Sequence, residues 1–166
     1  MNNYRKQKKF LIKKKANKPF FTIITVVKNA EKDIVKTLNS ISEQTFKNFE
    51  YLVIDGKSKD QTIQKILKYK KNINLLISEK DKGIYFAMNK GLRLANGEVI
   101  VFVNAGDKLT KNALRIVNNF MKISDQIFLY VKVYSFITYI TFNIGCMYRI
   151  YIMLVTPKYL KYTYHL

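Results

Sequence analysis

A regular alternation of strand-like and helix-like segments is the feature that most constrains the fold. Phe20 to Val27 is a continuous apolar, β-branched run, as expected for a strand that is covered on both faces. Residues 31–44 then place apolar side chains at helical spacing between charged ones. The same alternation continues as far as Val103. This order predicts an α/β fold, with a mostly parallel sheet and helices on both faces.

Three further strands are predicted, at 49–54, 73–77 and 99–103. Ser58 to Gln61 has the form of a capping box, a hydroxyl residue followed three positions later by Gln, and predicts the start of a helix. The next helix is predicted over 84–95, with Gly97 shortly after its end as a left-handed cap. Its apolar face is predicted to consist of Ile84, Met88, Leu92 and Ala95.

Most of the excess positive charge lies outside this alternating region. The net charge is +19, yet no acidic residue precedes Pro19 or follows Asp125. We interpret residues 1–18 as a basic, solvated tail, with attraction to anionic lipid or RNA as the alternative. Residues 19–125 are predicted to be the folded domain. Basic residues do not cluster with aromatic ones inside it, so no specific nucleic-acid partner is expected.

Residues 126–166 differ in character, because they are rich in aromatic residues and contain no acid. The uncharged run from Val133 to Tyr148 is shorter than the roughly 20 residues that span a bilayer. We keep two interpretations, an aberrant end that is foreign to the fold and a buried or membrane-associated segment. A spanning helix is the weaker interpretation.

Cysteine and histidine usage narrows the chemistry. Cys146 is the single cysteine and His165 the single histidine, so neither an internal disulfide nor a Cys/His metal cluster can form. Any metal would be a hard cation held by oxygen ligands. No signal peptide is recognisable at the N-terminus, and we expect a cytoplasmic protein, with peripheral contact at the inner face of the plasma membrane as an alternative.

Polar residues stand where the predicted strands end. Lys28-Asn29, Asp55 to Ser58 and Asn104 to Asp107 each follow a strand directly. Ligands of open parallel sheets bind beyond these carboxyl ends. One carboxylate there can accept hydrogen bonds from a base or ribose. Another can hold Mg²⁺ or Mn²⁺ against a diphosphate.

Five blocks of sequence, in order, resemble family 2 glycosyltransferases of the GT-A type. They are TVVKN at 25–29, TLNSISEQT at 37–45, VIDGKSKDQT at 53–62, SEKDKGIYFAMNKG at 78–91, and ANGE with FVNAGD within 95–107. The resemblance implies a Rossmann-like GT-A nucleotide-diphospho-sugar transferase fold, incomplete at the C-terminus. It also implies transfer of a sugar from a nucleotide-diphospho-sugar donor to a glycan or lipid-linked acceptor, in cell-surface polysaccharide synthesis.

The resemblance also implies roles for particular residues. Asp55 resembles the family's base-binding aspartate, and Asp107 resembles the last aspartate of its DxD-type motif, which binds Mg²⁺ or Mn²⁺. Many members of the family have acidic residues at the positions of Asn104 and Gly106. Many also have an aromatic residue that stacks on the base at the position of Lys28. The full set of nucleotide-sugar-binding residues implied in this way is Val27, Asn29, Asp55, Lys82, Asn104 and Gly106, with Asp107 as the metal ligand.

Structural interpretations compete with several of these roles. Asp60 is expected to cap the helix that follows it, and Lys82 is either a solvated charge or a diphosphate contact. Asn89 is either a packing residue or a ligand. Tyr85, Met88 and Leu92 are expected in the core rather than in a sugar platform.

Three functions therefore stand side by side. The first is a glycosyltransferase or a truncated remnant of one. A remnant is considered because the resemblance implies a catalytic carboxylate base further downstream, and no acidic residue follows Asp125. The second is a non-catalytic nucleotide-binding fragment. The third is a basic binder of membrane surfaces or nucleic acid.

Overall fold

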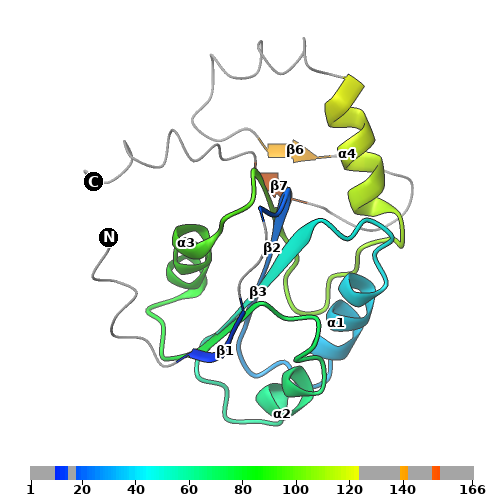
Figure 1. Ribbon diagram of the computed structural model, residues 1–166. Helices are drawn as coiled ribbons and strands as arrows, with labels where there is room; N and C mark the ends of the chain where they lie inside the picture. Colours follow the sequence, from blue (N-terminus) through cyan, green and yellow to red (C-terminus); the bar gives the residue numbers. More distant parts are fainter. Residues whose placement is uncertain (1–9, 15–17, 124–138, 142–150, 154–166) are drawn as a thin grey trace, which may run out of the picture.

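The computed structural model of the 166-residue chain describes residues 10–14, 18–123, 139–141 and 151–153. The strands form one sheet in the order β1-β4-β3-β2-β5-β7-β6, and the sheet lies between the helices (Figure 1). Their bounds are Phe10–Lys13 (β1), Phe21–Val27 (β2), Phe49–Asp55 (β3), Leu75–Ser78 (β4), Val99–Phe102 (β5), Tyr139–Thr141 (β6) and Tyr151–Met153 (β7). The helices are Ile34–Ser42 (α1), Thr62–Leu67 (α2), Ile84–Leu94 (α3) and Ala113–Ile123 (α4).

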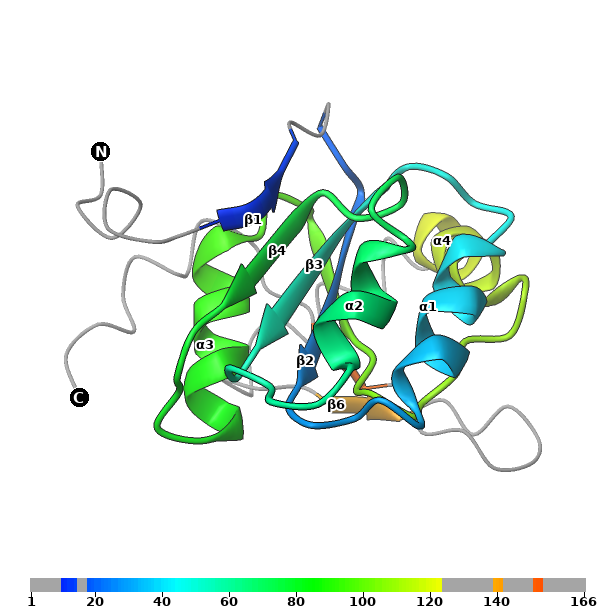
Figure 2. The same cartoon turned by 90° about the horizontal axis from the view of Figure 1, so that it is seen from below.

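The centre of the sheet is parallel. β2 pairs in parallel with both β3 and β5, and β3 pairs in parallel with β4. The register sets Val27 opposite Asp55, and Asp55 opposite Ser78. These three residues therefore form a row across the carboxyl ends of three neighbouring strands, which point the same way in Figure 2.

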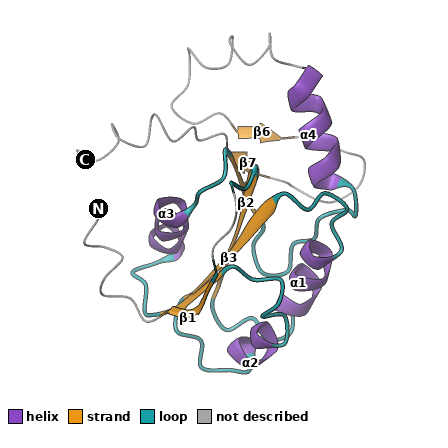
Figure 3. Cartoon of the chain, in the orientation of Figure 1, coloured by secondary structure: helices purple, strands orange, loops and turns teal. Residues whose placement is uncertain are grey.

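Helices cover both faces of the sheet. α1, α2 and α4 lie on one face and α3 on the other (Figures 1 and 3). Alternate residues of each strand face opposite ways, so the strands contribute to two cores. Ile23 and Val53 pack into the core beneath α1, α2 and α4, whereas Ile24 and Leu52 pack into the core beneath α3. The predicted α/β architecture is confirmed, and its central strands are mostly apolar because both faces are covered.

The prediction that Ser58 caps the start of α2 is wrong. The Ser58 hydroxyl donates to Asp55 instead of capping a helix, and α2 begins at Thr62. Asp60 acts at this point, because its Oδ1 accepts hydrogen bonds from the backbone N–H and the hydroxyl of Thr62, at 3.0 and 2.5 Å. The hydroxyl bond lowers the pKa of the Asp60 carboxyl. Asp60 thus contacts the first residue of α2, but it is not the expected helix cap, because the N-cap is Gln61 and makes no side-chain cap hydrogen bond.

The predicted apolar face of α3 is wrong at its first turn. Ile84 and Tyr85 are 52% and 76% exposed, while the buried positions are Ala87, Lys90, Gly91 and Leu94. Met88, Leu92 and Ala95 are partly buried against this core. The core expectation therefore fails for Tyr85. Lys90 is buried although it is charged, so the buried face of α3 differs from the face that the apolar residues predict.

Gly97 does not adopt the predicted left-handed conformation. The positive-φ glycines among the described residues are Gly83 and Gly106. Gly97 is instead required by close approach, because a Cβ there would lie 2.6 Å from the backbone nitrogen of Thr22.

The outer segments contribute strands to the sheet. β1, at residues 10–13 of the predicted basic tail, pairs antiparallel with β4. Beyond residue 125, β7 pairs antiparallel with β5 and with β6. The rest of the uncharged run 133–148 lies outside the described residues. Within the described part of the chain, no helix combines the length and the apolar character needed to cross a bilayer.

Candidate functional site

Asp55, at the end of β3, is fully buried, and its carboxylate accepts three hydrogen bonds. Its Oδ2 accepts from the Ser58 backbone N–H at 3.0 Å and from the Ser78 hydroxyl at 2.5 Å. Its Oδ1 accepts from the Ser58 hydroxyl. The side chain has no exposed surface. Asp55 therefore organises the ends of β3 and β4, and it can reach a ligand only if one of these donors exchanges.

The loop after β2 is tied to the loop after β3. The backbone N–H of Asn29 donates to the Ser58 hydroxyl at 2.8 Å, and the Asn29 side-chain oxygen accepts from the Lys59 N–H at 2.9 Å. Asn29 itself is exposed and has a positive φ of 49°, a conformation that asparagine tolerates better than most residues. Val27 is buried, and its carbonyl accepts from the Gly56 N–H at 2.8 Å. The stem of Lys28 lies beside Gly56.

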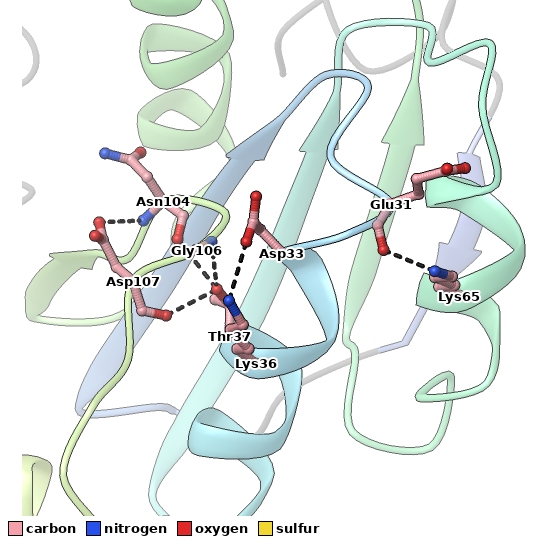
Figure 4. A network of polar contacts seen from close by, with 8 residues as sticks. All are labelled: Glu31, Asp33, Lys36, Thr37, Lys65, Asn104, Gly106 and Asp107. Carbon is pink, nitrogen blue, oxygen red and sulfur yellow. Dashed lines mark hydrogen bonds and ion pairs between the residues drawn. The ribbon is translucent and has the colours of Figure 1, made fainter.

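The N-A-G-D segment after β5 is held in place by α1 (Figure 4). The Thr37 hydroxyl oxygen lies 2.9 Å from the Gly106 backbone nitrogen and 2.8 Å from the Asp107 carbonyl oxygen. It also lies 3.2 Å from the Asn104 carbonyl oxygen. One buried threonine of α1 therefore contacts three of the four residues of this loop. Gly106 adopts a positive φ of 99°, which favours glycine.

Asp107 presents its carboxylate at the surface of this loop. Its Oδ2 accepts from the Asn104 backbone N–H at 3.2 Å, and the residue is exposed. The Asn104 side-chain oxygen is buried and has no hydrogen-bond partner among the described residues. Asp33, at the start of α1, lies on the other side of Gly106 and pairs with Lys36 at 3.2 Å (Figure 4). A second carboxylate thus stands beside the loop although the loop contains only one.

The oxygen atoms of this loop suit a hard divalent cation that is held mainly by the phosphate oxygens of a bound substrate. No cluster of three or more Asp, Glu, His or Cys side chains suited to a metal occurs in the described ranges. Mg²⁺ and Mn²⁺ do not need one, because such ions are commonly bound by one or two carboxylates together with substrate phosphates and water.

Lys82 and Gly83 lie on the loop between β4 and α3. Both are exposed, and a Cβ on Gly83 would meet no atom within 4 Å. This loop begins beside Asp55, since the Glu79 N–H donates to the Asp55 carbonyl at 3.0 Å. Asn89, further along α3, is exposed and so is not a packing residue. Lys82 therefore lies on a loop whose first residue is hydrogen-bonded to the end of β3.

The structure brings the sequence-predicted residues to one edge of the sheet in two groups. Val27, Asn29 and Asp55 are joined through Ser58 and Gly56, and Asn104, Gly106 and Asp107 are joined through Thr37. Ser58, Ser78 and Thr37 were not predicted. One feature of the sequence could have indicated Thr37, because it is a hydroxyl residue next to the apolar face of α1.

Comparisons with known proteins show which sequences this chain resembles. The model of the family described as glycosyl transferase family 2 matches residues 22–146, past the predicted domain boundary at 125. Among curated proteins, the chain is 36% identical over 100 residues to the poly(ribitol-phosphate) beta-N-acetylglucosaminyltransferase TarS of Staphylococcus aureus, covering 57% of this chain and 18% of TarS. It is 32% identical over 100 residues to the amylovoran biosynthesis glycosyltransferase AmsB of Erwinia amylovora, covering 57% of this chain and 33% of AmsB.

Solved structures show the same likeness. Staphylococcus aureus TarS in complex with UDP-GlcNAc superposes with a TM-score of 0.58 at 33% identity, over 62% of this chain and 31% of that one. A mannosyltransferase from Pyrobaculum calidifontis, in complex with GDP-Man and Mn²⁺, superposes with a TM-score of 0.56 at 24% identity, over 72% of this chain and 36% of that one. The chain thus spans between about a fifth and somewhat over a third of these relatives' lengths.

Proposed function

Because the chain belongs to glycosyl transferase family 2, we propose that it binds a nucleotide-diphospho-sugar at the carboxyl edge of its parallel sheet. The proposed activity of the whole protein is transfer of that sugar to a glycan or lipid-linked acceptor in cell-surface polysaccharide synthesis, on the cytoplasmic side of the membrane. The single observation that carries the proposal is the row of loops after β2, β3 and β5 at one edge of the sheet, the first two joined through Ser58 and the third held to α1 by Thr37.

The nucleoside belongs beside Asp55 in this proposal. The Ser58 and Ser78 donors fix the orientation of the Asp55 carboxylate, which can accept from a base or ribose once a donor exchanges. Asn29 is the exposed residue that adjoins it. The TarS complex with UDP-GlcNAc supports a nucleotide sugar as the donor class.

The diphosphate belongs between Lys82 and the N-A-G-D loop. Asp107, together with donor phosphate oxygens, would hold Mg²⁺ or Mn²⁺. When bound, such an ion supplies Lewis-acid stabilisation of the departing nucleoside diphosphate. Lys82 adds a positive charge near that group from the opposite side of the cleft. Thr37 keeps the loop in a fixed shape, so that Asp107 needs no rearrangement to bind.

Calorimetric titration of UDP and GDP, in Mn²⁺ and in EDTA, tests the proposal. We expect Mn²⁺ to strengthen binding of one nucleotide, and Asp107→Asn to reduce its affinity in Mn²⁺ to the value in EDTA. Glu98→Gln is the matched control, because Glu98 is an equally exposed carboxylate that precedes β5 at the opposite edge of the sheet. Failure of both nucleotides to bind the parent chain would refute the donor site. Binding that Asp107→Asn leaves unchanged would refute the metal assignment.

A further inference from the structure

A buried lysine joins α3 to the loop that precedes it. The Lys90 side chain is only 6% exposed and lies on the face of α3 that packs against the sheet. Its Nζ forms ion pairs with Glu79 and with Asp81. Both acids belong to the five-residue loop 79–83 between β4 and α3. No other lysine among the described residues is buried.

The two acids and the lysine depend on one another. Burial lowers the pKa of Lys90, but hydrogen bonds and charge from Asp81 and Glu79 outweigh burial and leave that pKa raised. A buried ammonium without partners would be strongly destabilising. The Asp81 side chain is itself only 9% exposed, and its Oδ2 has no hydrogen-bond partner in the described part of the chain. If the loop moved away, the Lys90 ammonium would be left buried on α3 without its two partners.

The same loop carries two exposed residues at the carboxyl edge of the sheet, where the donor site is proposed. Its first residue is anchored to β3, since the Glu79 N–H donates to the Asp55 carbonyl. Asp81 is anchored to α3 through Lys90. Lys82 and Gly83 follow directly and are exposed. The ion pairs thus fix the backbone on one side of Lys82, while its side chain remains accessible.

We propose that Lys90 is a positioning residue, which holds the 79–83 loop so that Lys82 faces the diphosphate of the donor. This inference rests on the proposed function. Lys90 is buried and does not touch the donor; its effect passes through Asp81 and Glu79 to Lys82. Loss of Lys90 should therefore weaken binding of the phosphates and spare binding of the nucleoside.

A double-mutant cycle separates positioning from stability. UDP and uridine are titrated in Mg²⁺, with GDP and guanosine as the second pair, against the parent, Lys82→Met, Lys90→Met and the double variant. We expect each single variant to weaken binding of the diphosphate by about tenfold and to change binding of the nucleoside less than about twofold. The double variant should lose no more than either single one, because both changes remove the same contact.

Two further variants keep the test decisive. Lys47→Met removes the same charge from an exposed site at the opposite edge, where Lys47 Nζ donates to the Ser42 carbonyl, and should leave diphosphate affinity unchanged. If Lys90→Met does not fold, Asp81→Asn replaces it in the cycle. Additive losses, or an equal loss of nucleoside affinity, would overturn the positioning role while the donor site stands. A parent chain that binds neither diphosphate would overturn both.

Discussion

The two carboxylates at the strand ends differ in what their removal should do. Asp55 is buried and accepts three hydrogen bonds, whereas Asp107 is exposed and accepts one. A buried acceptor that satisfies several donors contributes to stability, and an exposed one contributes little. Loss of ligand binding in an Asp55 variant therefore has to be read together with the stability of that variant.

Asp55→Ala should destabilise the fold by about 1–3 kcal/mol, because donors of Ser58 and Ser78 lose their partner in a buried setting. Asp107→Ala, the matched control, should change the free energy of unfolding by less than about 1 kcal/mol. Urea unfolding followed by circular dichroism measures both. Equal stability of the two variants would contradict the structural role of Asp55.

Gly97→Ala should be destabilising by about 1–3 kcal/mol or more. The added methyl carbon would lie 2.6 Å from the Thr22 nitrogen and 2.7 Å from the Phe21 carbonyl carbon, and backbone cannot easily move aside. Asn119→Ala, at an exposed position of α4, should stay within about 0.5 kcal/mol of the parent. Thermal and urea unfolding of the two variants give the comparison, and an unaffected Gly97→Ala would refute the close approach.

Individual residues show where sequence reasoning succeeds and where it stops. Asp107 could be placed at the carboxyl edge of the sheet because a polar run directly follows an apolar strand. The hydrogen-bond saturation of Asp55 could not, since it depends on Ser78 from another strand. Lys90 could not be assigned to the buried face of α3, because its partners compensate the charge only after folding.

At the level of elements, the strands were predicted better than the helix ends. A run such as Phe21–Val27 is covered on both faces, so its apolar character is continuous and its limits are sharp. Helix ends depend on which polar side chain takes which backbone group. Ser58 was expected to cap α2, but Asp55 and Asn29 occupy its hydroxyl.

The pairing of β7 with β5 gives an element-scale prediction. In a chain that ends at Asp125, the amides of β5 should exchange with deuterium faster than in the full chain, because β5 becomes an edge strand. The amides of β3, which lies between β2 and β4, should exchange equally in both and serve as the control. Equal exchange of β5 amides in the two chains would show that β7 does not protect them.

At the scale of the whole molecule, the proposed site lies at an edge of the sheet that carries exposed positive charge. Residues 19–125 carry 18 basic and 11 acidic residues, and Lys28, Lys57 and Lys82 are exposed on loops at the carboxyl edge. An anionic donor should be attracted to such an edge, and the attraction should be screened by salt.

Nucleoside diphosphate affinity should therefore fall as NaCl is raised from about 50 to about 500 mM, where the Debye length shortens severalfold. Affinity for the uncharged nucleoside is the internal control and should change little. Titrations of UDP and uridine at constant Mg²⁺ measure the difference. A salt response of equal size for both ligands would argue against a phosphate site at this edge.

Amide chemical-shift mapping tests the central claim, a nucleotide site at the carboxyl edge of the sheet, most directly. Saturation with UDP or GDP in Mg²⁺ should shift resonances of residues 27–29, 55–58 and 104–107 most strongly. Residues at the opposite edge, where Glu50 accepts hydrogen bonds from Thr22 and Asn96, should be unaffected. The largest shifts at that opposite edge, or no saturable shifts with either nucleotide, would contradict the account.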